Sequence, residues 1–134
     1  MDISGDYSVF IKEEAELFGV SPDLIQAIIQ QESESFQSAF RYERKFYWKY
    51  IAGRDKKRLG GHWPTDISED QERTLRSCSF GLMQIMGQVA REFGFMAENL
   101  FDLYDPKQNI HFGVMKLAKE IARGKERGEK NPIH

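Results

Sequence analysis

The chain has 134 residues, the size of one compact domain, and its 40% hydrophobic and 30% charged residues exclude a disordered protein. No apolar run approaches the roughly 18 residues of a membrane-spanning helix. Acidic residues near the start predict no secretory signal peptide. The formal net charge of −2 argues against a general polyanion binder, and the single cysteine, Cys78, excludes an internal disulfide.

The spacing of apolar residues predicts a mainly α-helical domain. A first helix is expected over 7–18. A second is expected over 22–34, because Ser21 can cap it and Pro22 suits the first helical position. An aromatic-rich helix is expected over 38–51.

The second half of the chain is predicted to be helical as well. Glycines and a proline within 54–67 indicate an irregular loop. Strand signals are weak, no hairpin is expected, and the polar tail from Gly124 is expected to fray. The helices expected here cover 68–76, with a capping box at Ser68 and Gln71, then 82–93, then a last helix that begins at Asp105-Pro106.

Glu32 continues the apolar stripe of the second helix, since it follows Ile28 by four residues and Ile29 by three. It also lies in the last turn, where the helix carries partial negative charge. Burial and this dipole would both favour a protonated carboxyl, which a general acid requires. The alternative is a side chain that reaches solvent at the helix end, and periodicity alone leaves both open.

Glu43 interrupts the aromatic stripe of the helix expected over 38–51. A carboxylate there is costly unless it is paired, and Arg41, Tyr42 and Arg44 are close enough in sequence to pair with it. Glu43 is therefore either part of a structural ion pair or a second functional acid. Two carboxyls in apolar settings suit glycosidic bond cleavage.

Positive charge is concentrated in residues 41–58, where eight basic and two acidic residues give a local charge of +6. Such a run is either a solvated face or a groove for an anionic substrate. Aromatic residues among the cations also allow a nucleic-acid-binding module, which the near-neutral charge of the whole chain argues against.

Three motifs occur in order at 28–33 (IIQQES), 80–86 (FGLMQIM) and 105–113 (DPKQNIHFG). Together they resemble the signatures of the soluble lytic transglycosylase catalytic domain, in the lysozyme-like superfamily that also includes goose-type lysozyme. The resemblance implies a mainly α, lysozyme-like fold, with residues 1–134 forming a single catalytic domain.

The resemblance also implies a peptidoglycan-degrading enzyme that cleaves the β-1,4 bond between N-acetylmuramic acid and N-acetylglucosamine. Glu32 would be the general acid and base of a lytic transglycosylase that forms 1,6-anhydro-N-acetylmuramic acid. A hydrolytic muramidase would use Glu32 together with a second carboxylate such as Glu43. The substrate-binding residues implied are Ser79, Gly81, Met83, Gln84, Tyr104 and Asn109, with Asn109 also a brace near the cleft.

Two departures from the family pattern are visible. The 47 residues between Ser33 and Gly81 make a longer spacing than is usual in the bacterial enzymes. The Ala-Tyr-Asn motif that follows the last helix is missing, and its tyrosine normally hydrogen-bonds the catalytic acid. Either Tyr42 or Tyr104 replaces it, the chain is a fragment, or the domain is a non-catalytic glycan-binding module.

We expect the domain to act as a monomer on peptidoglycan glycan strands, without a metal ion, a cofactor, nucleic acid or a transmembrane segment. The expected location is extracytoplasmic or phage-associated, at the cell wall.

Overall fold

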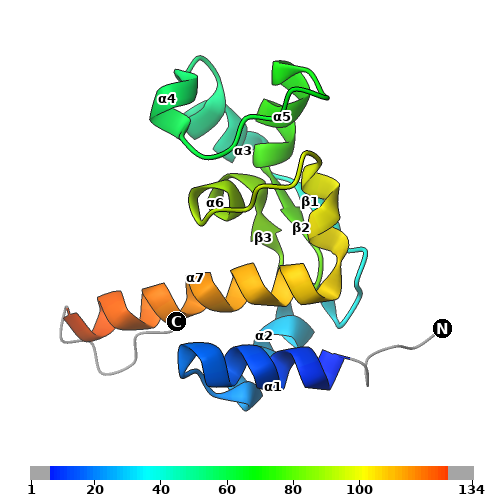
Figure 1. The fold of residues 1–134 in the computed structure, drawn as a ribbon, viewed down its shortest axis with the longest axis vertical. Helices are drawn as coiled ribbons and strands as arrows, with labels where there is room; N and C mark the ends of the chain where they lie inside the picture. Colours follow the sequence, from blue (N-terminus) through cyan, green and yellow to red (C-terminus); the bar gives the residue numbers. More distant parts are fainter. Residues whose placement is uncertain (1–6, 127–134) are drawn as a thin grey trace.

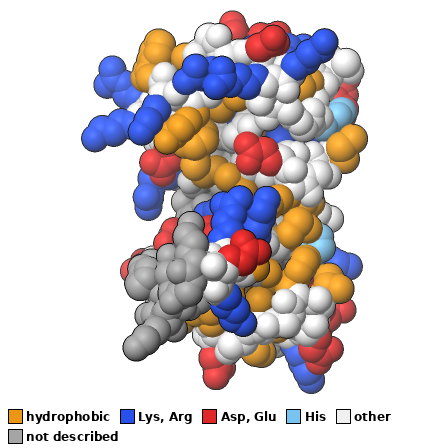
Figure 2. Space-filling model, turned by 90° about the vertical axis from the view of Figure 1, so that its left-hand side faces the viewer, with side chains coloured by type: hydrophobic (Ala, Val, Ile, Leu, Met, Phe, Trp, Pro, Cys, Tyr) orange, Lys and Arg blue, Asp and Glu red, His pale blue; other side chains and the backbone are white. Residues whose placement is uncertain are grey.

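The domain consists of a lower and an upper lobe, and the molecule narrows between them (Figures 1 and 2). The computed structural model describes residues 7–126. The lower lobe contains α1 (Tyr7–Phe18), α2 (Pro22–Ser33) and the long α7 (Pro106–Glu126). None of the helices in this part of the chain combines the length and the apolar character needed to cross a bilayer.

The core of the lower lobe forms where these three helices pack together, and it is supplemented by Leu82 and Met83 from the upper lobe. The predicted start of α2 is confirmed, because the Ser21 hydroxyl accepts the Leu24 N–H at 3.4 Å and Pro22 opens the helix. The aliphatic side chains that the three helices bury here include Ile11, Ile25, Ile29, Ile110 and Leu117.

The upper lobe contains a three-stranded antiparallel sheet that the sequence did not predict. Its order is β1 (Phe40–Tyr42), β2 (Cys78–Phe80), β3 (Ile85–Met86). The helix expected over 38–51 is therefore wrong in its first part: after β1 come only α3 (Arg44–Phe46) and the π-helix η2 (Tyr47–Ile51). The conformation of β1 depends on its pairing with β2, in which Arg41 lies opposite Ser79. Helical periodicity cannot reveal a strand partner so far away in the sequence.

The remaining elements surround this sheet. The capping box that begins α5 (Glu69–Arg76) is confirmed. The helix expected over 82–93 is instead a turn, the strand β3 and the short helix α6 (Gly87–Glu92). The tail is helical to Glu126, so fraying from Gly124 is wrong there, and the rest lies outside the described residues. The elements around the sheet are α4 (Lys56–Leu59), α5 (Glu69–Arg76), α6 (Gly87–Glu92) and the 3₁₀ helix η3 (Leu100–Tyr104), and α4 lies within the expected loop.

Helix α7 contributes side chains to the cores of both lobes. Ile110 and Val114 are buried among α1 and α2. Phe112, between them in the sequence, packs instead with Phe80 and Phe95 in the upper core. Since successive helical residues point in directions about 100° apart, one helix can present opposite faces to two cores. This shared helix fixes the lobes relative to each other.

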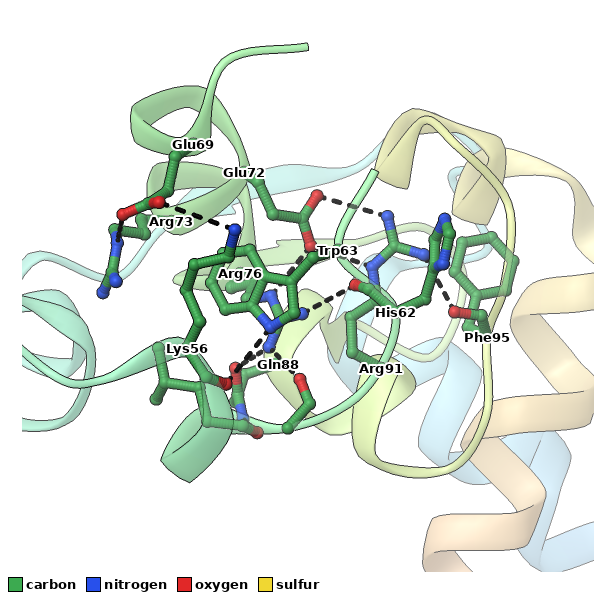
Figure 3. Close-up of polar contacts among 12 residues, drawn as sticks. Lys56, His62, Trp63, Glu69, Glu72, Arg73, Arg76, Gln88, Arg91 and Phe95 are labelled. Atoms are coloured by element: carbon green, nitrogen blue, oxygen red, sulfur yellow. Dashed lines mark hydrogen bonds and ion pairs between the residues drawn. The ribbon is translucent and has the colours of Figure 1, made fainter. Parts of the chain in front are cut away.

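A buried cluster of charged side chains holds the upper lobe together (Figure 3). The Glu72 carboxylate accepts hydrogen bonds from Nε of Arg76 at 2.8 Å and Nε of Arg91 at 2.9 Å, and all three side chains are at most 1% exposed. Arg76 also donates to the carbonyls of Gly60 and His62, while the Trp63 ring lies 3.8 Å from its guanidinium carbon. Two cations thus depend on one carboxylate.

The substitution Glu72→Gln should destabilise the domain by about 3–5 kcal/mol, because it leaves two buried guanidinium groups without a counter-charge. The control is Glu69→Gln on the same helix, whose half-exposed carboxylate pairs with Lys56 and Arg73 and should cost about 0–1 kcal/mol. Unfolding in guanidinium chloride measures both. Equal losses would contradict a special role for Glu72.

Candidate active site

A pocket of about 330 Å³ lies between α2, α7 and the turn that joins β2 to β3. Its walls bring together the first two motifs noted in the sequence, through Glu32 from one and Met83, Gln84 and Ile85 from the other. Gly113, at the end of the third motif, lines it too. Segments far apart in the sequence therefore meet at one concave site.

Glu32 lies on the pocket wall at the C-terminal end of α2. The buried ridge of α2 runs through Ile25, Ile29 and Ser33, four residues apart, and Glu32 lies beside this ridge. Its side chain is exposed, so of the two alternatives left open by the sequence the structure shows the one that reaches solvent. Within the described residues no hydrogen bond or ion pair occupies its carboxylate. The group is free to meet a ligand.

The end of α2 is fixed by its own backbone. Glu34 adopts the left-handed conformation with φ 53°, and its N–H donates to the carbonyls of Gln30 and Ile29. The Ser33 hydroxyl donates to the Ile29 carbonyl at 3.0 Å and is buried. The two residues of the Glu-Ser pair therefore have different roles: Ser33 hydrogen-bonds to the end of the helix, and Glu32 faces the pocket.

The turn of the second motif forms the opposite wall. Gln84 donates its backbone N–H and its side-chain amide to the Gly81 carbonyl, at 3.1 and 3.0 Å. Its φ of 49° is uncommon for a residue with a side chain and marks a constrained position. Met83 packs against Gly113, where a Cβ would lie only 2.5 Å from the Met83 sulfur.

Asn109 holds this turn from below and is fully buried. Its Oδ1 accepts the Met83 N–H at 2.8 Å, and its Nδ2 donates to the carbonyls of Phe80 at 2.6 Å and Leu103 at 2.8 Å. Both amide donors are engaged inside the protein. Gly81 has φ +72°, and a Cβ there would lie 2.4 Å from Asn109 Nδ2.

Neither Gly81 nor Asn109 lines the pocket, and the predicted site residues Ser79 and Tyr104 lie outside its lining as well. Ser79 is buried in β2, and Tyr104 packs with the rings of Phe40, Phe80 and Phe101. Tyr42 is exposed in β1. Within the described residues neither tyrosine hydroxyl hydrogen-bonds to Glu32.

Glu43 does not line the pocket that contains Glu32. It precedes α3, its N–H donates to the Ser77 carbonyl at 2.9 Å, and its carboxylate lies 3.7 Å from an Arg41 guanidinium nitrogen. The sequence left two interpretations of Glu43, a structural ion pair or a second functional acid, and the geometry shows the ion pair with Arg41.

Sequence reasoning missed Lys116 and Glu120, an ion pair at 3.2 Å on α7 that also lines the pocket. Their spacing from Gly113 is the sequence signal that could have identified them as pocket residues. Residues three and seven positions after a glycine share its helix face, and this glycine belongs to the third motif.

Cys78 is buried in β2 and is not suited to act as a nucleophile. Burial, followed by the nearby charge of Glu43, raises the pKa of its thiol to about 11. Burial and then Cys78 also raise the pKa of Tyr104. Between residues 7 and 126, no group of three or more His, Cys, Asp or Glu side chains is arranged to hold a metal ion.

A comparison with protein-family models matches the chain to the transglycosylase SLT domain over residues 9–131. The chain belongs to this family. No match was found among curated proteins or among solved structures. The mostly helical architecture with its small sheet agrees with a lysozyme-like SLT domain. The family consists of lytic transglycosylases, which cleave glycosidic bonds in peptidoglycan, so the predicted enzyme class is confirmed.

The substitution Gly81→Ala should destabilise the SLT domain more than Gly53→Ala. Gly81 has φ +72° and Gly53 has φ +71°, so both variants carry the strain of an alanine at positive φ, roughly 1–2 kcal/mol. Only at position 81 does the new methyl group meet Asn109, whereas nothing lies within 4 Å at position 53. An additional loss of about 1–3 kcal/mol is expected at position 81 in urea unfolding. Equal losses would show that the contact with Asn109 is unimportant.

The stability of the domain should fall as pH rises from about 9 to about 11. In this range the Cys78 thiol ionises in the unfolded chain, with its ordinary pKa of 9.0, but stays neutral in the fold, where the pKa is about 11. Two pKa units correspond to about 3 kcal/mol, present below pH 9 and lost by pH 11. Comparison with Cys78→Ala isolates this contribution, and identical pH profiles would contradict it.

Proposed function

We propose that this SLT domain cleaves the β-1,4 bond between N-acetylmuramic acid and N-acetylglucosamine as a lytic transglycosylase, with Glu32 as its general acid and base. The observation that carries the proposal is the position of Glu32: an unpartnered carboxylate on the wall of a pocket, across from the turn formed by Met83 and Gln84. A sugar chain in this pocket would contact both.

In the first step the protonated Glu32 carboxyl gives its proton to the glycosidic oxygen, and the bond between that oxygen and C1 of the muramic acid breaks. The departing N-acetylglucosamine leaves with a new hydroxyl. Positive charge develops at C1 and its ring oxygen, beside the carboxylate that Glu32 has become.

In the second step the Glu32 carboxylate takes the proton of the muramic acid 6-hydroxyl while that oxygen attacks C1. The new bond closes the 1,6-anhydro ring and returns Glu32 to its protonated state. No water is consumed, so the reaction needs one carboxyl and no second residue to activate a nucleophile. The Glu32 pocket supports this route, because its other acid, Glu120, is paired with Lys116.

The residues around Glu32 have two kinds of role in this proposal. Met83 and Gln84 contact the sugar, since they line the pocket. Asn109 and Gly81 are positioning residues: Asn109 holds the Met83 N–H, and Gly81 leaves the space that Asn109 occupies. Hydrolysis with Glu43 as a second acid is less well supported, because Glu43 is outside the pocket and next to Arg41.

The place of action follows from the substrate. Peptidoglycan is the cell-wall polymer on which SLT domains act. We therefore assign the domain, as a monomer, to the cell wall, either outside the cytoplasm or in a phage particle.

The substitution Glu32→Gln should lower the release of products from purified peptidoglycan by about 10²–10⁴-fold, because glutamine cannot transfer the proton. Glu34→Gln is the matched control, since Glu34 is exposed at the same helix end and does not line the pocket. Mass spectrometry of the parent's products should find fragments one water lighter than hydrolytic products. Undiminished activity of Glu32→Gln would refute the role of Glu32, and products with only reducing ends would refute the anhydro route.

A further inference from the structure

A second pocket, of about 440 Å³, lies in the upper lobe between η2, α4 and α6. Apolar side chains of Phe46, Ile51 and Val89 contribute to its lining, and the half-exposed Tyr50 ring lies 4.9 Å from that of Phe46. Arg54, Arg58 and Glu92 add charge to this lining. We call it the basic–aromatic pocket. It shares no lining residue with the pocket that contains Glu32.

The pocket belongs to the strongly basic segment, where cations outnumber their partners. Of the eight basic side chains in 41–58, Arg41 pairs with Glu43 and Lys56 with Glu69. The other six have no carboxylate within 4.0 Å among the described residues, and Arg54 and Arg58 are two of them. Figure 2 shows Lys and Arg side chains gathered with hydrophobic ones on the upper lobe. These six basic side chains are therefore available to bind anions.

The pocket also carries one negative group. Glu92 is exposed at the end of α6, and its Oε2 accepts the side-chain amide of Gln88 at 2.9 Å. Neither Arg54 nor Arg58 forms an ion pair with it. Separated charges of both signs beside an apolar wall complement a ligand that has carboxylate, ammonium and aliphatic parts.

The two pockets are neighbours on the protein. Ile85 of β3 lines the Glu32 pocket, and Gln88 of α6 lines the basic–aromatic pocket. Three residues of chain span at most about 11 Å, so the Cα atoms of these two lining residues lie within that distance of each other. A branch of the polymer held in the first pocket could reach the second.

We propose that the basic–aromatic pocket binds the peptide branch of the peptidoglycan strand, which adds to the proposed function and rests on it. Arg54 and Arg58 would hold free carboxylates of the peptide, and Glu92 the ammonium group of its diamino acid. The aliphatic stem of that residue would lie against Phe46 and Val89. A polymer of phosphodiesters fits less well, because it offers no cation to Glu92.

The test is titration of the folded protein with a free stem peptide: N-acetylated, with carboxylates and one unmodified side-chain amine. The double substitution Arg54→Gln/Arg58→Gln should weaken binding about tenfold or more, as loss of two charged hydrogen-bonding groups does. Arg44→Gln/Lys45→Gln removes the same charge from exposed residues outside the pocket and should bind like the parent. Acetylating the side-chain amine should weaken binding to the parent but not to Glu92→Gln.

Three results would overturn the proposal: no binding of the peptide to the parent, equal binding by the Arg54/Arg58 variant, or tighter binding of a glycerol phosphate polymer than of the peptide. The titration is independent of catalysis. Glu32→Gln should still bind the peptide while its release of anhydro products falls, so failure of the peptide site and failure of the proposed reaction give different results.

Discussion

The side-chain amide of Asn109 fixes the geometry on which the Glu32 pocket depends. It joins α7 to three other places at once: the end of β2 at Phe80, the turn at Met83 and the end of η3 at Leu103. All three bonds are buried, where an unpaired amide or carbonyl would be costly. The turn therefore has one favourable position against α7, and Gly81 is the residue that leaves room for it. Met83 and Gln84 reach the pocket as a consequence.

The upper lobe is held by a different kind of interaction. Glu72 binds Arg76 and Arg91, and these guanidinium groups extend to carbonyls at Gly60, His62 and Phe95. The loop segments 60–62 and 95–97 are thereby attached to α5 and α6. Since α6 also forms a wall of the basic–aromatic pocket, the buried charges support a binding surface that a small hydrophobic core alone would leave loose. Hydrogen bonds satisfy every buried polar side-chain atom among residues 7–126.

The sequence predicted the starts of helices well where the signal lies within a few residues of the helix itself. The cap at Ser21 and the capping box at Ser68 are both in place. The sheet was missed because β1 is only three residues long and takes its conformation from β2, almost forty residues later. Asn109 was placed near the cleft by resemblance to a family motif, but its burial and its three partners are tertiary facts. The sequence left burial and exposure of Glu32 both open, because periodicity identifies a helix face without showing where the neighbouring core ends.

The exposure of Glu32 is compatible with the role proposed for it, because the proton is transferred only when a glycan strand lies in the pocket. A glycan strand that fills the space between α2 and the Met83–Gln84 turn displaces water from the carboxyl. Desolvation favours the neutral acid, which is the form that protonates the glycosidic oxygen. Within the described residues no protein group orients the carboxyl, so in this proposal the substrate itself, held by the rigid turn and by its peptide branch, supplies the orientation.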